Sequence, residues 1–278
     1  MTKKIVSFGD SFILGSEIPN NEHGDLAWPG LISDRLGVDY TTCAVAGCGN
    51  EAIAQQIYTY FHQHDKINTL AVINWTWSMR WDFHIKDRDV WVTLGPTCVP
   101  QKLFQHVDSE QAEKLINFYK TYTGESDMWN RYRSLQAIFS AQKFLETQNI
   151  PSIQTFMDTN LFCKHNNGDR LDHYRAFADP NWPTVSTISD LELLPESIRN
   201  ELDADYNQKI VPGYVEILQD LVSPSMQTFE GQTFLEWSRS HGYPVTPAPG
   251  DHPLEQAHQH AAEIWIDHYQ ACLEKIES

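Results

Sequence analysis

The chain of 278 residues is long for one domain and short for two, so we predict a single domain, residues 1–278, with insertions at about 82–108 and 160–230. A hydrophobic content of 41% is ample for a folded core and excludes a disordered chain. The net charge of −17 would repel phosphate backbones and anionic membranes, so we expect neither a nucleic-acid nor a membrane partner.

The cysteine pattern and the N-terminal sequence indicate in which cellular compartment the protein is expected. The five cysteines are scattered and form no CxxC pair, which predicts free thiols without a disulfide framework or a structural zinc site. The first residues lack a signal-peptide pattern, and no segment approaches the roughly 20 apolar residues of a membrane span. We therefore expect a cytoplasmic protein.

The first third of the chain alternates between strand and helix patterns. Short apolar runs at 4–8, 38–46 and 69–77 predict strands, and helically spaced apolar residues predict helices at 26–36 and 51–64. A succession of strand, helix and strand with short loops is typical of a parallel sheet in an α/β protein.

The rest of the chain is predicted to add further helices and one strand. The strand pattern lies at 151–157. The helical patterns lie at 109–148 with a break near 123–124, at 194–205, at 212–221, and in a last helix with Pro253 in its first turn.

Three residues that can carry chemistry follow predicted strands or precede the last helix. Ligands of open parallel sheets bind at the carboxyl ends of the strands, and Ser11 and Gly47 follow the first and second strands. Acyl-bond hydrolysis needs a hydroxyl nucleophile, a base and donors for the developing oxyanion. Ser11 can supply the hydroxyl, main-chain N–H groups of Ser11 and Gly47 the donors, and His252 the base. By itself, Ser11 would also suit a helix N-cap.

Three short stretches resemble sequence blocks of the GDSL-type or SGNH hydrolases, serine esterases of which some are encoded by bacteriophages. The stretches are FGDSF at 8–12, AVAGCGN at 44–50 and GDHP at 250–253. The resemblance implies a flavodoxin-like three-layer sandwich with about five parallel strands and long insertions. It also implies Ser11 as nucleophile, His252 as base, Gly47 as oxyanion donor and no cofactor.

The third block of that family, Gly-x-Asn-Asp, has no counterpart in VINWTWSMR at 72–80. Thr76 or Asn74 could supply the third oxyanion donor. Strand alternation points both side chains to the same face, so the choice between them stays open.

The second departure from the family pattern concerns the carboxylate that orients the base. The family places an Asp three residues before the His, where this chain has Pro249, and the nearby carboxylate is Asp251. A triad with Asp251 and a Ser–His dyad both remain open. Asp10 is expected to cap or pair locally, without a chemical step.

The remaining candidates concern metal and substrate. His258 belongs to a His-rich stretch, but its spacing from His252 matches no recognised ligand pattern, so we expect solvated helix histidines and no metal site. Trp77 and Arg80 lie beside a strand end, where an aromatic ring can stack on a sugar.

We predict a serine ester hydrolase that acts on a small acyl ester, with a carbohydrate ester as the favoured substrate. A lipid or thioester hydrolase, and a catalytically degenerate carbohydrate-binding module on the same fold, are the alternatives. The oligomeric state stays open.

Overall fold

The computed structural model describes residues 3–64, 66–85, 90–95, 107–119, 127–161, 211–247 and 251–276. Its centre is a parallel sheet in the strand order β2-β1-β3-β6. The strands are β1 (Lys4–Gly9), β2 (Asp39–Thr42), β3 (Thr69–Trp75) and β6 (Ser152–Phe156). The parallel α/β sheet predicted from the sequence is confirmed, with this strand order matching the start of the flavodoxin-like order.

The described residues form four parallel strands where about five were expected. At the free edge of β6, Met226 makes a single parallel bridge with Gln154. The main-chain N–H of Gln227 also donates to the Gln154 carbonyl at 2.7 Å. One bridge thus takes the place of a fifth strand.

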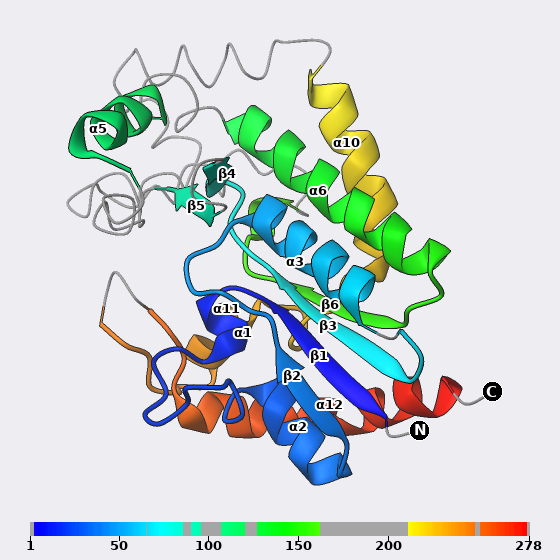
Figure 1. Ribbon diagram of the computed structural model, residues 1–278. Coiled ribbons are helices and arrows are strands. Elements are labelled where there is room, and N and C mark those ends of the chain that lie inside the picture. Colours follow the sequence, from blue (N-terminus) through cyan, green and yellow to red (C-terminus); the bar gives the residue numbers. More distant parts are fainter. Residues whose placement is uncertain are drawn as a thin grey trace, which may run out of the picture.

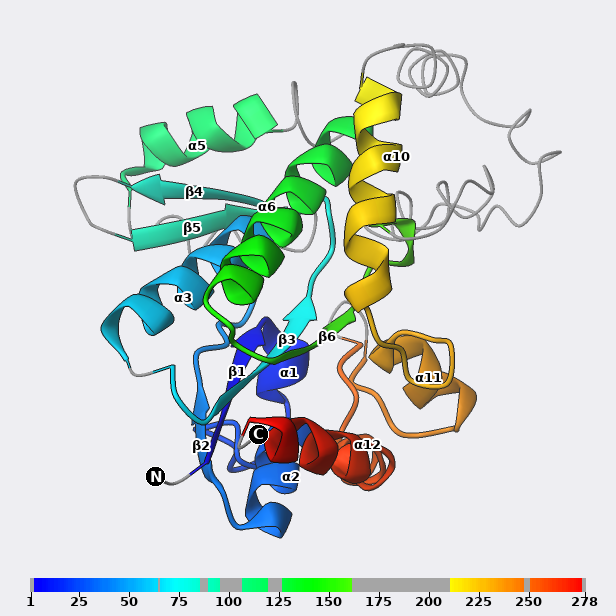
Figure 2. The same ribbon diagram turned by 90° about the vertical axis from the view of Figure 1, so that its right-hand side faces the viewer.

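Helices cover both faces of the sheet and make three layers (Figures 1 and 2). On one face lie α2 (Trp28–Leu36) and α12 (Glu255–Lys275). On the other lie α3 (Asn50–Gln63) and α6 (Asp127–Thr147), with α10 (Val211–Val222) packed on α6. Each face of the sheet has its own hydrophobic core, and alternate strand residues belong to each, because successive side chains of a strand point to opposite faces. Ile5 packs toward α2 and α12, and Val6 packs toward α3 and α6.

The predicted insertion at 82–108 contains an antiparallel hairpin. Its strands are β4 (Trp81–Ile85) and β5 (Val90–Leu94). With the following helix α5 (Ser109–Phe118), the hairpin encloses a small hydrophobic cluster of its own. Sequence patterns did not predict the hairpin.

Four short elements complete the described chain. They are α1 (Ser11–Leu14), η2 (Thr159–Leu161), η3 (Ser223–Ser225) and α11 (Phe234–Ser240). In the described residues, no helix is both long enough and apolar enough to cross a membrane.

Most expected boundaries lie within two residues of the observed ones, and two differences bear on the candidate site. The second strand ends at Thr42 instead of 46, and α12 begins at Glu255 with Leu254 as its N-cap, so Pro253 precedes the helix. Pro253 instead makes an antiparallel bridge with Val245, which closes the loop before α12. The expected helix at 194–205 and the break near 123–124 lie outside the described residues.

Candidate active site

Ser11 lies at the carboxyl end of β1, as the first residue of α1. Asp10 is the N-cap of this helix, and its Oδ1 accepts a hydrogen bond from the Phe12 N–H at 3.0 Å. The cap turns the chain sharply out of the buried strand. As a result the Ser11 side chain stands at the strand end instead of continuing along the sheet.

Gly9 lies just before this turn, at a position where no side chain would fit. Its φ is +149°, and a Cβ would come within 2.6 Å of Ile13 Cγ2 and 2.7 Å of the Asn74 carbonyl oxygen. Any other residue would push β1 away from β3 or α1 away from the sheet. The glycine of the FGDSF stretch is therefore explained by close packing.

His252 approaches Ser11 from the loop before α12. Its Nε2 lies 2.6 Å from Ser11 Oγ, although the two residues are 241 positions apart. The loop is held by a pair of hydrogen bonds with Thr246: the His252 N–H donates to Thr246 Oγ1, and the Thr246 N–H donates to the His252 carbonyl, both at 2.9 Å. The Phe12 ring stacks on the imidazole with a centroid distance of 4.6 Å. These contacts aim Nε2 at the hydroxyl.

The environment of His252 favours a neutral imidazole. Burial lowers its pKa below the usual 6.5, the charge of Arg80 lowers it further, and the charges of Asp10, Glu17 and Asp251 oppose the shift with smaller effects. Among the described residues, Nδ1 has no hydrogen-bond partner. A neutral imidazole can accept a proton from a hydroxyl at physiological pH.

Asp251, the neighbour of the base in sequence, forms an ion pair with another residue. Its backbone is in the left-handed region, with φ of +49°. Its Oδ1 lies 2.9 Å from Nη2 of Arg239, in an ion pair. Of the two arrangements left open by the sequence, this geometry favours a Ser–His pair. Pro249, at the family's Asp position, lies outside the described residues.

The segment that carries Gly47 lies beside the end of β1. The Val45 N–H donates to the Gly9 carbonyl at 2.9 Å, and the Cys48 N–H closes a turn by donating to the Val45 carbonyl at 3.2 Å. Gly47 has a φ of +83° within this turn, a conformation that glycine adopts without steric cost. The main chains of Ser11 and Gly47 thus come from adjoining segments.

The two expected third donors, Thr76 and Asn74, differ in what their donor groups bond to. Both side chains are fully buried. Thr76 Oγ1 donates to Asp10 Oδ2 at 2.7 Å. Asn74 Oδ1 accepts from Thr155 on β6 at 2.8 Å. The Thr76 hydroxyl proton is therefore engaged by Asp10, whereas the Nδ2 of Asn74 has no hydrogen-bond partner among the described residues.

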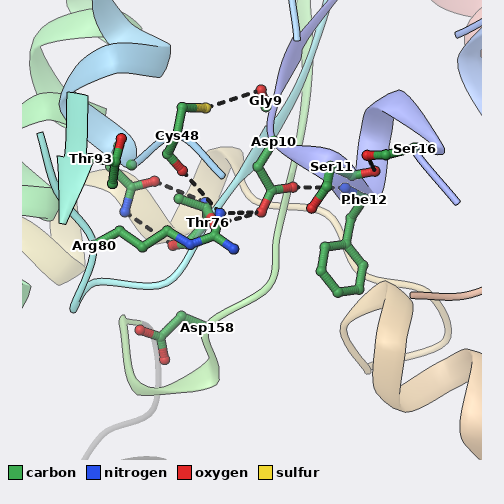
Figure 3. A network of polar contacts seen from close by, with 12 residues as sticks. Gly9, Asp10, Ser11, Phe12, Ser16, Cys48, Thr76, Arg80, Thr93 and Asp158 are labelled. Carbon is green, nitrogen blue, oxygen red and sulfur yellow. Dashed lines mark hydrogen bonds and ion pairs between the residues drawn. The ribbon is translucent and has the colours of Figure 1, made fainter. Parts of the chain in front are cut away.

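Trp77 and Arg80 are largely buried, so the structure gives no support to the sugar contact expected of them. They retain 7% exposure each. The Trp77 ring packs edge-on against Phe12 at a centroid distance of 5.1 Å, and the Arg80 guanidinium lies 4.9 Å above it. Arg80 pairs with Asp10 at 2.7 Å (Figure 3). The sequence signalled local pairing for Asp10 but not its partner, 70 residues away.

His258 was expected to be solvated and is completely buried. Its Nδ1 accepts from the Trp28 N–H at the start of α2, at 3.2 Å. Burial lowers its pKa to about 3, so the ring stays neutral. No group of three or more potential metal ligands comes together in the part of the chain that the structure describes.

Comparisons with known proteins give remote likenesses. No family model matches the chain, and no curated protein matches it. Among solved structures, a member of the lipolytic protein G-D-S-L family from Veillonella parvula is 10% identical with a TM-score of 0.40, over 95% of this chain and 97% of that chain. The psychrotrophic esterase EstA from Pseudoalteromonas sp. is 8% identical with a TM-score of 0.41, over 98% and 99% of the two chains.

A third solved structure is a larger protein. The acetyl xylan esterase Est2A from Butyrivibrio proteoclasticus is 12% identical with a TM-score of 0.45, over 98% of this chain and 64% of that chain. At these TM-scores the likenesses carry no weight for function, which depends on the geometry of the site.

Proposed function

We propose that this chain is a serine ester hydrolase with Ser11 as nucleophile and His252 as general base. The observation that carries the proposal is the 2.6 Å approach of Ser11 Oγ to His252 Nε2. Two side chains so distant in sequence meet at the carboxyl end of a parallel sheet, where such folds place their ligands. A hydroxyl within hydrogen-bond reach of a neutral imidazole is the arrangement that nucleophilic acyl transfer requires.

The chemistry follows from the protonation state of the imidazole. For Nε2 to accept the Ser11 proton, the single hydrogen of the neutral ring must be on Nδ1. Ser11 Oγ attacks the ester carbonyl as its proton passes to Nε2, and the imidazolium then protonates the leaving alcohol. A water molecule, deprotonated by the same nitrogen, hydrolyses the acyl-enzyme and restores Ser11.

The developing oxyanion is assigned to main-chain donors. The N–H of Ser11, at the beginning of α1, and the N–H of Gly47, in the adjoining turn, are the candidates. Thr76 is left out because its hydroxyl donates to Asp10. Asn74 stays a candidate for a third donor, because its Nδ2 has no hydrogen-bond partner among the described residues. Hydrogen-bond donors fixed in place before the reaction stabilise the transition state without reorganisation.

The substrate proposed is an ester with a short acyl group. Ser11 is only 6% exposed, and the Phe12 ring stacks on His252 and packs against Trp77. A long acyl chain would have to displace these packed rings. The proposal does not include sugar stacking on Trp77, because that ring is buried.

A fluorophosphonate probe and a series of p-nitrophenyl esters test the proposal. We expect wild type to be labelled at Ser11 and to hydrolyse the acetate with a higher kcat/KM than the octanoate. Ser11→Ala and His252→Ala should each lose at least about 10³-fold in kcat/KM. The matched control is Ser16→Ala, which removes a neighbouring hydroxyl that bonds to the Ser11 carbonyl at 3.2 Å.

Two outcomes would replace the proposal. Absence of both labelling and turnover in wild type would favour a non-catalytic binding module on this fold. Faster turnover of the octanoate, or of an acyl thioester, would favour a lipid or thioester hydrolase.

A further inference from the structure

Arg80 places a buried charge beside the candidate active site, at the end of the segment that follows β3. One guanidinium nitrogen, Nη1, has three oxygen neighbours: Asp10 Oδ2 at 2.7 Å, Thr76 Oγ1 at 2.8 Å and the Cys48 carbonyl at 3.0 Å (Figure 3). Asp10 itself is completely buried.

The neighbours of Nη1 adjoin the two proposed oxyanion donors. Asp10 precedes Ser11, and its second oxygen caps α1 through the Phe12 N–H at 3.0 Å. Cys48 follows Gly47, and its Sγ donates to the Gly9 carbonyl at 3.3 Å. A single nitrogen atom therefore connects the turn that carries the Ser11 N–H with the turn that carries the Gly47 N–H.

A neutral arrangement would hold these segments together at a lower cost. Removing two opposite charges from water is expensive, and apolar replacements of buried ion pairs are often as stable. Charge-assisted hydrogen bonds, in contrast, fix distances and directions more strictly than apolar contacts. The position of this pair, between two groups whose relative placement catalysis requires, suggests a geometric role.

We propose that Arg80 is a positioning residue that sets the relative placement of the Ser11 and Gly47 main-chain N–H groups. It acts through Asp10 on the first group and through the Cys48 carbonyl on the second, and it does not touch the substrate. This inference rests on the proposed esterase function, which it deepens.

Kinetics of Arg80 variants test the proposal. Arg80→Met should lower kcat by about 10- to 100-fold, because a misplacement on the order of 1 Å costs about that much. KM should stay within about threefold, since oxyanion donors act mainly in the transition state. Arg80→Lys should recover most of kcat, because one ammonium offers three N–H donors to the three oxygens around Nη1. The matched control is Arg35→Met. It removes an arginine of α2 from an ion pair with Glu263 of α12, at 3.6 Å, and should leave kcat unchanged.

Active-site titration separates positioning from loss of folded protein. Fluorophosphonate should still label Arg80→Met at close to one site per chain, with the lower kcat expressed per labelled site. If labelling falls in proportion to activity, or if Arg80→Lys is as impaired as Arg80→Met, the role is structural and the proposal is overturned. Should Arg80→Met not fold, Asp10→Asn/Arg80→Met removes both charges and is expected to show the same low kcat, because the bond to the Cys48 carbonyl is missing.

Amide hydrogen exchange tests the same proposal without any substrate. Arg80→Met should speed exchange about tenfold or more in peptides covering 8–16 and 44–52, while α12 stays as protected as in wild type. Unchanged exchange in both peptides overturns the proposal, whatever the kinetics. A wild type that neither hydrolyses esters nor reacts with the probe contradicts the esterase function, and exchange then decides the role of Arg80 separately.

Discussion

At the scale of single residues, the candidate site depends on a few contacts made by short-range geometry. Gly9 lets β1, β3 and α1 approach closely, and Asp10 turns the chain so that Ser11 meets His252. Ser11, Gly47 and His252 could be selected from the sequence, because glycine, serine and histidine at strand ends or loops have recognisable chemical uses. The partner of Asp251 could not, because Arg239 belongs to a helix that only folding brings near.

Asp251 gives the first prediction. Asp251→Asn should change kcat/KM by less than about threefold, because its carboxylate pairs with Arg239 and surface pairs of this kind contribute little. Steady-state hydrolysis of p-nitrophenyl acetate measures the effect, with Ser11→Ala as the inactive reference. A loss as large as that of Ser11→Ala would establish a triad that uses Asp251.

The pKa of His252 gives the second. Burial lowers it, while Asp10, Glu17 and Asp251 oppose the shift and Arg80 reinforces it. The neutral form is the active one, so kcat/KM is lost as pH falls through this lowered pKa. The acid limb of the pH–kcat/KM profile should therefore have its midpoint below 6.5. A midpoint above 6.5 would mean that a carboxylate stabilises the imidazolium in the free enzyme.

At the scale of elements, hydrophobic periodicity predicted the β1, β3 and β6 strands and the long helices well, because their buried faces repeat over several turns or strand residues. The β4–β5 hairpin was not predicted, because its strands have only five residues each and β4 is partly exposed and carries Asp82. The start of helix α11 has a local sequence signal, the capping box of Thr233 and Glu236, from which this helix could have been predicted. Short elements with one exposed face contain too few repeating apolar residues to be predicted from hydrophobic periodicity alone.

Asp82 links the hairpin to the helix that follows the Gly47 turn. Its carboxylate accepts from the Gly49 N–H at 2.9 Å, the Ala52 N–H at 2.8 Å and the Thr93 hydroxyl at 2.5 Å. Asp82→Ala should lower the free energy of unfolding by about 1–3 kcal/mol, because buried donors at the start of α3 lose their acceptor. Urea denaturation measures it. Thr93→Val, which leaves the bonds to α3 intact, is the control, and an equal effect of both variants would contradict the linking role.

At the scale of the whole molecule, the two ends of the chain meet on one face of the sheet. Helices α2 and α12 pack together (Figure 2), and His258 accepts from the Trp28 N–H across 230 positions. This contact holds the start of α12 in place and, with it, the loop that carries His252. The base is thus positioned by elements from opposite ends of the sequence.

The buried ring of His258 predicts a pH dependence of stability. Its pKa is about 3 in the folded protein, against about 6.5 for an ordinary histidine. Between these values the unfolded chain binds a proton that the folded protein does not, so the free energy of unfolding falls as pH drops from about 6.5 toward 3. The slope from one such group approaches about 1.4 kcal/mol per pH unit.

Denaturation at several pH values measures this slope. His258→Gln should flatten it, while His23→Asn, at an exposed histidine, should not. If His258→Gln fails to fold, the wild-type ring can be followed directly by NMR. A ring that titrates near pH 6.5 would contradict the prediction.

The sequence by itself determined the parallel α/β sheet and the candidates Ser11, Gly47 and His252, because periodicity and strand-end position are local properties of the chain. Only the tertiary structure decided which side chains meet. It assigned Thr76 and Arg80 to Asp10, turned Asp251 toward Arg239, and brought His252 to Ser11. The physical reason is that a buried polar group bonds to the nearest satisfactory partner in space, and distance along the chain does not indicate which partner that is.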